Sequence, residues 1–398
     1  MSERARLVLW PAIIAHFVAY GGFTLIAPLY ALRLGASTAT IGIIVALGFV
    51  LPLALALPAG AVLPRIGLRA PLLVGPVLVA LGAIGPLLVP GLVPLAIAEI
   101  LVGLGHLAVV LAGQTAVGSL GAATEGEANF GAYGASVAAG QMIGPLVAGA
   151  LADAAGLRTA FAVAVAAALV AGTILTLGRR HLSVSLPSPA RLHRPGWLAT
   201  ARSPALRYAM TVSGMMVLAR TAHSTFLPVY LAQHGFGSGS IGLLVGLLAL
   251  VTVVVRPLLP VISRLLGGQA RSLLLALAAT FLGAAAMAIP PSWTTLLGMT
   301  LLLGTGVGLG QPLSMALASA STGAARRGLA LGYRITVNRL TQVLTPAVLG
   351  IIANDMGVAS AFVITGVTIG ALLPVMCRLR GAVPVAAAER GAEAGPHQ

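Results

Sequence analysis

Long apolar stretches occupy almost the whole of this 398-residue chain. A helix that spans a bilayer needs roughly 20 apolar residues. Only 8% of the residues are charged and 58% are hydrophobic, too little polar surface to cover a soluble globule of this size. Twelve stretches are long enough to span, at approximately residues 8–31, 38–63, 71–90, 93–118, 130–152, 158–178, 207–231, 239–262, 272–290, 294–319, 330–353 and 358–379. The sequence therefore predicts an all-α integral membrane protein with twelve transmembrane helices.

Two parts of the chain repeat one another. A pattern of Pro, Tyr, Gly and Ile-Gly at 28–42 returns 200 residues later, at 228–242. A second pattern, of Pro, Gly and Ala-Phe at 144–161, returns 201 residues later, at 345–362. In an apolar chain such doubling is typical of secondary transporters that are built from two repeats around a central site.

One long segment divides the chain. Residues 179–206 contain five Arg, two His and four Pro, and they split the apolar stretches six and six. The final segment is rich in Ala, Glu and Gly, a composition typical of disordered ends. We expect an N-terminal six-helix bundle at 1–178, a cytoplasmic linker at 179–206, a C-terminal six-helix bundle at 207–380 and a disordered cytoplasmic tail at 381–398.

The net charge of +15 does not indicate a nucleic-acid partner, because the positions of the cations along the chain fit the expected membrane topology. All 23 cations are Arg, and 17 of them fall in segments that twelve spans with cytoplasmic termini would place inside. Short connections favour a bacterial inner (plasma) membrane. Cys377 is the single cysteine, so the chain forms no internal disulfide. We expect a monomer without cofactor or metal, whose partners are a small-molecule substrate, protons and the lipid bilayer.

A loop signature carries a family resemblance. The segment 60–69 has Gly, then Pro64 and Arg65, then Gly and another Arg, and 260–267 is a weaker copy. With six plus six helices and a basic middle loop, this resembles the major facilitator superfamily of the 12-helix drug/proton antiporter type, with two pseudo-symmetric six-helix bundles. The family has Asp where Pro64 stands, so Glu125 or Glu127 is a substitute partner, or merely a solvated acid. The resemblance implies a gating set of Gly60, Arg65, Gly67, Arg69, Glu125, Glu127 and Arg264.

A second motif bears on the direction of transport. Gly140, Gly144, Pro145 and Gly149 resemble the antiporter motif of the same family, from which Ala148 departs mildly. In family members this motif accompanies proton-driven efflux. The alternative is a packing motif, because Pro bends a helix and Gly lets a neighbouring helix approach.

One carboxylate lies inside an apolar stretch. Charges in such a stretch are costly and are functional candidates by default. Glu99 shares a helix face with Gly103 and His106, and a carboxyl that gains and loses a proton as access alternates suits proton coupling. Glu99 and His106 are therefore the proton-coupling candidates. The alternatives are that Glu99 pairs permanently with an Arg or is wet, and that His106 hydrogen-bonds a neighbouring helix.

The second half carries buried cations instead. Arg220 is at mid-span with His223 three residues later, Arg256 and Arg339 are in inner halves of their helices, and Arg suits bidentate binding of carboxylate or phosphate. Arg334 starts a polar stripe down one helix, and its alternative role is as a headgroup anchor. Arg256 is alternatively a gate residue, and each Gln alternatively joins two helices. The substrate-binding candidates are His16, Tyr20, Gln141, Arg220, His223, Arg256, Gln311, Asn338 and Gln342.

Enzyme motifs are absent from the sequence. It has no His-Glu-x-x-His zinc motif, no Gly-x-Ser-x-Gly elbow and no phosphate loop with its Lys. The expected function is therefore secondary active transport, most simply proton-coupled export of a small organic compound, anionic or zwitterionic. The alternatives are proton-coupled import of an organic anion and a membrane sensor or partner protein that transports nothing.

Overall fold

The structure is a computed structural model that describes residues 3–118, 126–182, 202–321 and 327–379. Glu125, most of the predicted linker and the predicted tail lie outside these residues. The described part of the chain is helical throughout, which confirms the all-α membrane fold. The first half contains α1 (Glu3–Arg33), α2 (Thr38–Ile66), α3 (Arg69–Leu88), α4 (Leu92–Gly118), α5 (Gly126–Ala155), α6 (Leu157–Leu177) and the short helix η2 (Arg179–His181).

The second half has a broken helix where the first has a continuous one. Its elements are α8 (Pro204–Gln233), α9 (Ser238–Val254), η3 (Arg256–Leu258), α10 (Leu259–Leu265), α11 (Gln269–Ala285), η4 (Ala286–Ala288), α12 (Trp293–Ala320), α13 (Arg327–Met356) and α14 (Ala359–Leu379). Among the described residues, ten helices are long and apolar enough to cross a membrane, with α9 to α10 taken together. Arg207, Arg220 and His223 interrupt the apolar run of α8, and α11 has only 17 residues. The count of twelve spans stays a prediction.

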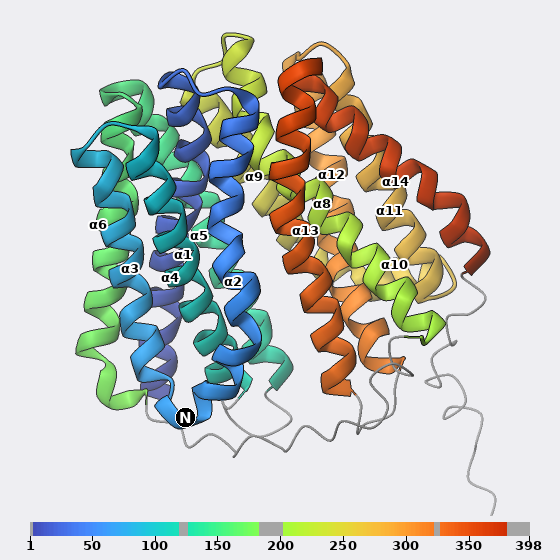
Figure 1. The fold of residues 1–398 in the computed structure, drawn as a ribbon. Coiled ribbons are helices and arrows are strands. Elements are labelled where there is room, and N and C mark those ends of the chain that lie inside the picture. The colour runs from blue at the N-terminus through green and yellow to red at the C-terminus, as the bar shows by residue number, and fades with distance from the viewer. Residues whose placement is uncertain (1–2, 119–125, 183–201, 322–326, 380–398) are drawn as a thin grey trace, which may run out of the picture.

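The helices of the first half lie together on the left of Figure 1 and those of the second half on the right. We call the end where α1 begins the lower face and the end where it ends at Arg33 the upper face, as the figure is drawn. Two long contacts join the halves, α2 with α13 and α5 with α9.

The repeated sequence patterns build these two contacts at the upper face. A Cβ added to Gly42 of α2 would clash with the carbonyl oxygen of Pro346 in α13, and one added to Gly242 of α9 would clash with that of Pro145 in α5. Gly42 and Gly242 are 200 residues apart, and the two prolines are 201 apart. Each half therefore supplies one glycine and one proline to a pair of related close crossings, in which only glycine fits against the partner backbone.

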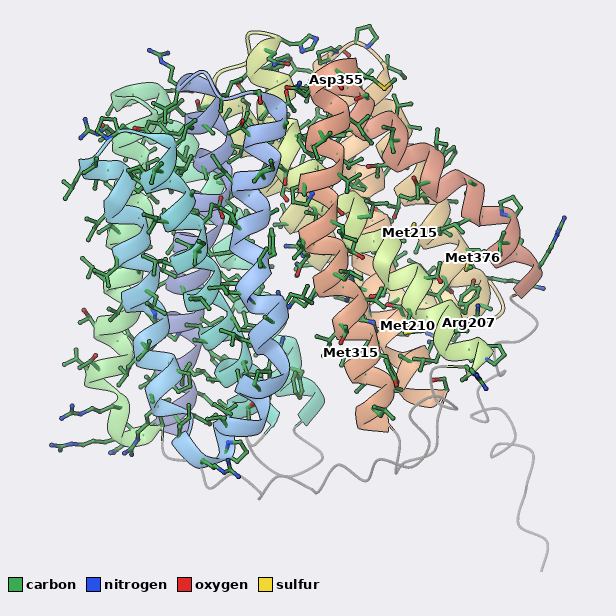
Figure 2. All side chains as sticks on the ribbon, in the orientation of Figure 1. Arg207, Met210, Met215, Met315, Asp355 and Met376 are labelled. Atoms are coloured by element: carbon green, nitrogen blue, oxygen red, sulfur yellow. The ribbon has the colours of Figure 1, made fainter. Side chains whose placement is uncertain are left out.

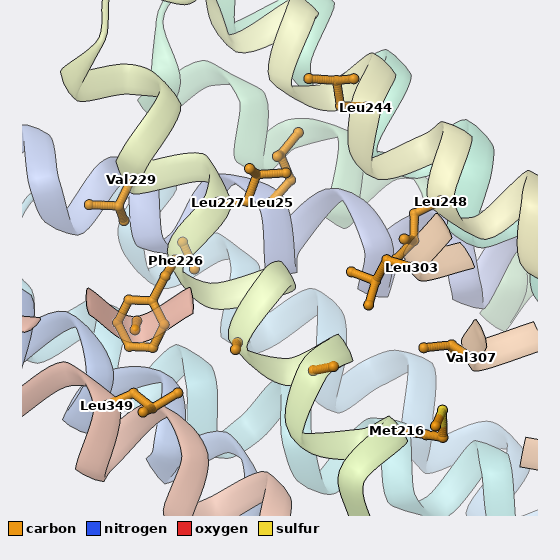
Figure 3. Packing of buried hydrophobic residues seen from close by; sticks show 14 of the residues in the cluster. Leu25, Met216, Phe226, Leu227, Val229, Leu244, Leu248, Leu303, Val307 and Leu349 are labelled. Atoms are coloured by element: carbon orange, nitrogen blue, oxygen red, sulfur yellow. The ribbon is translucent and has the colours of Figure 1, made fainter. Parts of the chain in front are cut away.

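The hydrophobic packing differs between the two faces. One large cluster of buried residues extends through both halves and includes Leu25 of α1 and Leu227 of α8, both labelled in Figure 3. A smaller cluster contains Leu9, Leu63 and Leu72 from the lower ends of α1, α2 and α3, and every member belongs to the first half. The halves thus share a core in the upper part, while the lower part of the first half has a core of its own.

Inside the first half, α2 and α4 cross with their backbones in contact. A Cβ on Gly103 of α4 would clash with the carbonyl oxygen of Gly48, whereas one on Gly298 of α12 would have no heavy atom within 4 Å. We expect Gly103→Ala to lower the free energy of unfolding by about 1–3 kcal/mol, because the clash is with backbone that has no rotamer to change. The matched variant Gly298→Ala is expected to keep or raise stability, since Ala favours a helix over Gly by about 1 kcal/mol. Thermal unfolding of the purified protein in detergent measures both, and equal melting temperatures would contradict the crossing.

Candidate functional site: a central cavity between the two halves

A cavity of about 430 Å³ lies between the halves. Four helices of the first half line it, α1, α2, α4 and α5, and four of the second half, α8, α9, α12 and α13. None of its lining residues comes from α3, α6, α11 or α14. The helices that line the cavity include those that join the halves at the upper face, so the cavity lies where a relative movement of the halves would change its access.

Most of the predicted site residues meet in this cavity. The lining includes both proton-coupling candidates and seven of the substrate-binding candidates: Glu99, His106, Tyr20, Gln141, Arg220, His223, Gln311, Asn338 and Gln342. His16 and Arg256 do not line it. His16 is fully buried behind His106, and Arg256 is an exposed residue of η3 whose guanidinium lies near Gly134 of α5.

The acidic side of the cavity belongs to α4. Glu99 is only 6% exposed, and its carboxylate lies so close to α2 that a Cβ on Gly48 would be 2.7 Å from Oε2. Within the described ranges Glu99 has no ion pair with an arginine. The carboxyl is therefore buried and uncompensated by a cation, rather than held in a permanent pair. The contact of the Glu99 carboxylate with Gly48 of α2 could not be predicted from helix periodicity alone.

Two histidines and two aromatic rings of α1 and α4 pack against one another in the first half. His16 Nε2 and His106 Nδ1 are 3.2 Å apart and share a hydrogen bond whose donor depends on the tautomers. The Tyr20 ring stacks on the His106 ring with centroids 3.7 Å apart, and Phe17 contacts His106 edge-on. His106 thus joins α4 to α1, which is the alternative interpretation of this residue, and it also lines the cavity.

The basic side of the cavity belongs to the second half. Arg220 Nη2 donates to Gln141 Oε1 at 2.9 Å, a bond that links α8 to α5 across the two halves. Arg339 Nη1 donates to Gln342 Oε1 at 3.0 Å within α13. In the part of the chain that the structure describes, neither guanidinium has a carboxylate partner. Two half-buried cations therefore face the cavity, and the hydrogen bonds described for them go to neutral amides.

Neighbouring polar groups complete this side. His223 is 1% exposed, and among the described residues neither of its ring nitrogens has a hydrogen-bond partner. Asn338 Oδ1 accepts a hydrogen bond from Ser213 Oγ at 2.8 Å, which joins α13 to α8. Tyr20 of α1 lines the same cavity as Glu99, Arg220 and Arg339.

Arg334 is not a headgroup anchor, which was the alternative considered for it. It is 7% exposed, and its guanidinium donates to the Gln311 carbonyl oxygen at 2.9 Å, to Gln311 Oε1 at 2.7 Å and to Ser314 Oγ at 3.1 Å. These bonds fix α13 to α12. Arg334 therefore stiffens the wall of the cavity from behind and orients Gln311, which is a lining residue.

The antiporter-like motif serves two packing surfaces. Gly140 and Gly144 meet α1, where a Cβ would clash with the carbonyl oxygens of Ile14 and Val18, and Pro145 and Gly149 meet α9 of the other half. The packing interpretation thus has direct structural support, and it gives the motif a place in the contact between the halves.

The gating candidates lie at the lower ends of their helices. Gly67 ends α2 with a positive φ of 74°, a conformation that favours glycine, and its N–H donates to the Leu63 carbonyl at 2.9 Å. Arg65, Arg69 and Arg264 are exposed, and Arg264 Nε donates to the Pro260 carbonyl at 3.4 Å. Gly60 lies in α2 and Glu127 in the first turn of α5, while Glu125 is outside the described residues. The substitute pairing with Arg65 or Arg69 therefore stays a prediction.

Arg339 lines the cavity but is not among the predicted substrate-binding residues, although the sequence places it with the cations of the second half that suit binding of an anion. Arg339 directly follows Asn338 in the sequence. It is therefore not part of the stripe of Arg334, Asn338 and Gln342, whose members are four residues apart. The three-residue spacing to Gln342, which also places two side chains on one helix face, was the available signal. Gln114, Thr24 and Ser224 line the cavity as well.

Comparisons with known proteins agree with this architecture. The family model of the Major Facilitator Superfamily matches residues 9–291 and 268–397. No curated protein sequence matches the chain.

Several solved structures share the fold at low sequence identity. A variant of the peptide transporter POT in complex with sulfate is 16% identical, with a TM-score of 0.75, over 94% of this chain and 95% of its own. A POT family transporter in complex with a thioalcohol-conjugated peptide is 15% identical, with a TM-score of 0.79, over 95% and 96%. A variant of the nucleoside transporter NupG is 12% identical, with a TM-score of 0.78, over 94% and 99%. The chain belongs to the Major Facilitator Superfamily, and it is a membrane transporter rather than an enzyme.

Proposed function

We propose that this protein exports a small organic anion or zwitterion in exchange for protons, by alternating access to the central cavity. The observation that carries the proposal is the separation of charge across one cavity. Glu99 of the first half lies on one side, and Arg220 and Arg339 of the second half lie on the other. A movement of the halves would change the distance between these charges, which is the physical requirement for coupling two ions to one cycle.

The basic side supports an anionic group on the substrate. A guanidinium binds a carboxylate or phosphate through two parallel hydrogen bonds, and a half-buried cation without a counter-ion is stabilised by such a ligand. The cavity volume of about 430 Å³ is in the range of small-molecule sites. A POT family transporter of the same fold was solved with 5-aminolevulinic acid, a compound that carries both an amine and a carboxylate. That likeness supports a zwitterion as one substrate type.

Glu99 supports the coupling to protons. It is the only carboxylate that lines the cavity in the described residues, and it has no cation partner there. A carboxyl in this position can take up a proton when the cavity opens to one side and release it when the cavity opens to the other. The stacked rings of His106 and Tyr20 line the same cavity as Glu99.

Two features support outward transport. One is the resemblance of the segment 140–149 to the antiporter motif. The other is the topology, in which the lower face is proposed to be cytoplasmic by the positive-inside rule. Exposed arginines gather at that face: Arg65, Arg69, Arg179, Arg180, Arg207, Arg264 and Arg271. With this orientation, in a bacterial inner membrane, the shared upper core closes the outer side. The bundles 1–178 and 207–380, joined by the segment 179–206, would be the moving units.

Substrate uptake into proteoliposomes under imposed pH gradients tests the proposal. An acidic interior drives substrate in if protons leave as it enters, whatever the orientation of the protein in the vesicle. We expect accumulation with an acidic interior and none with an acidic exterior. Accumulation only with an acidic exterior would instead show symport, which corresponds to import in the cell. No response to either gradient would contradict proton coupling.

Arg220→Ala is expected to weaken binding of a carboxylate-bearing ligand roughly 10- to 100-fold, because a hydrogen bond to a charged group contributes about 1.5–3 kcal/mol. Ligand-induced stabilisation against thermal unfolding measures this, with a panel of organic anions, zwitterions and cations. The matched control is Arg207→Ala, in the same helix but exposed at its lower end (Figure 2). If Arg220→Ala and the Arg207→Ala control bind anions equally well, the charge argument is wrong.

A further inference from the structure

The first turn of α9 receives its cap from the other half of the protein. The N-cap residue of this helix is Gly237, which has no side chain to accept a hydrogen bond. Instead, Asp153 at the upper end of α5 accepts two bonds, from the Ser238 N–H to Oδ1 at 2.8 Å and from the Gly239 N–H to Oδ2 at 2.8 Å. A helix begins with N–H groups that lack partners and carries positive partial charge there, so a carboxylate stabilises this end.

The glycines around Ser238 allow the carboxylate to approach. A Cβ on Gly239 would lie 2.7 Å from Asp153 Oδ2, and a Cβ on Gly237 would lie 3.2 Å from the same atom. A Cβ on Gly149, one helical turn before Asp153, would clash with the Ser238 carbonyl oxygen. The backbone at the start of α9 therefore lies directly against α5. Gly237 and Gly239 have no side chains there, which leaves room for the carboxylate of Asp153.

The sequence repeat provides an internal comparison. At the related position in the first half, α2 caps itself, because the Oγ of its N-cap residue Ser37 accepts the Thr40 N–H at 3.2 Å. The residue 201 positions after Asp153 is Asn354, at the upper end of α13. Its amide donates to Asp355 at 3.1 Å rather than to α2. The two crossings at the upper face are thus related in backbone, and one of them carries an ionic cap from the opposite half.

We propose that Asp153 is a positioning residue of the transport cycle, which favours closure of the upper face by capping α9 across the two halves. When the halves separate at this face, the start of α9 loses its acceptors and Gly237 supplies no replacement. The opposite crossing has no such penalty, because Ser37 remains with its own helix. The inference rests on the alternating access that we propose, but it requires neither the substrate nor the direction of transport.

A distance measurement across the upper face tests this role. Spin labels on Thr159→Cys and Gln233→Cys, both exposed at the upper ends of α6 and α8, report the separation of the halves in a Cys377→Ser background. In Asp153→Ala we expect the ratio of closed to open upper face to fall by about 2- to 30-fold, the range expected for loss of a helix cap. Asn354→Ala, the repeat-related control, is expected to leave the distances unchanged.

A second variant separates gating from mere helix stability. Gly237→Ser, added to Asp153→Ala, gives α9 the same kind of self-cap that Ser37 gives α2, and the extended backbone of Gly237 accepts a Ser. We expect the double variant to recover the melting temperature of the parent but to keep the wider distance distribution. Full recovery of the distances, or unchanged distances in Asp153→Ala, would overturn the proposal. If Asp153→Ala changes the distances as expected but the wild type shows no proton-driven transport, the proposed function is contradicted and this inference still stands.

Discussion

Glu99→Gln is expected to abolish substrate accumulation driven by a pH gradient while exchange of substrate across the membrane continues. Gln has almost the same size and keeps a hydrogen-bonding group beside Gly48, so the packing of α4 against α2 is retained. It cannot bind or release a proton in the physiological range. Because no other carboxylate lines the cavity in the described residues, the protein has no substitute carrier there. The measurement compares gradient-driven uptake with exchange of labelled against unlabelled substrate in proteoliposomes.

The control for this variant is Asp355→Asn, at the upper end of α13 and exposed to solvent (Figure 2). It removes one carboxylate from the same protein without touching the cavity, and we expect normal gradient-driven uptake. If Glu99→Gln still accumulates substrate to the level of the wild type, Glu99 has no part in coupling. If exchange is lost as well, Glu99 holds the substrate instead of the proton.

Gly42→Val is expected to reduce transport at least tenfold by preventing closure of the upper face. A Cβ on Gly42 would clash with the carbonyl oxygen of Pro346, and the obstruction is backbone that cannot rotate away. The helices α2 and α13 must then separate. The upper face therefore stays open, and the transport cycle cannot pass through the state in which this face is closed. Gly298→Val is the control, because its Cβ meets no atom within 4 Å. Transport rates and the distance between spin labels on Thr159→Cys and Gln233→Cys measure the effect, and a normal transport rate in Gly42→Val would contradict the role of this crossing in closing the upper face.

The architecture could be predicted from the sequence because it depends on patterns that repeat along the chain. The bilayer allows few backbone arrangements, so long apolar stretches already imply helices. The repeated Pro and Gly positions indicated the two-bundle fold. Their role in the contact between the halves follows only from the structure, in which Gly42 packs against Pro346 and Gly242 against Pro145.

The site could be predicted in part. Costly groups inside apolar stretches pointed to Glu99 and Arg220, and both line the cavity. The prediction placed His16 and Arg256 at the substrate as well, but His16 is one layer behind the surface and Arg256 lies at a helix break after Val254. The depth of a residue in the membrane can be estimated from its position in the sequence. The rotation of a helix about its axis and the places where it breaks depend on the neighbouring helices.

Partners from distant helices were not predictable from single stretches. An anchor at the lipid headgroups was the alternative role for Arg334, but Gln311 and Ser314 of α12 hold its guanidinium inside the protein. Gln141 was predicted as a binding residue, and its bond to Arg220 of the other half could not be inferred from either helix alone. The cap that Asp153 provides to α9 belongs to the same class, since it joins residues 85 positions apart in the chain.

The most direct test of the central claim is a measurement of protons rather than of substrate. Vesicles that contain the wild-type protein and a pH-sensitive dye are prepared without a pH gradient, and a transported anion or zwitterion is added outside. Exchange predicts that the interior becomes alkaline as substrate enters and protons leave, and that vesicles with Glu99→Gln show no such change. An interior that becomes acidic would show that protons and substrate move together. A dye signal that stays constant while substrate enters would contradict proton coupling altogether.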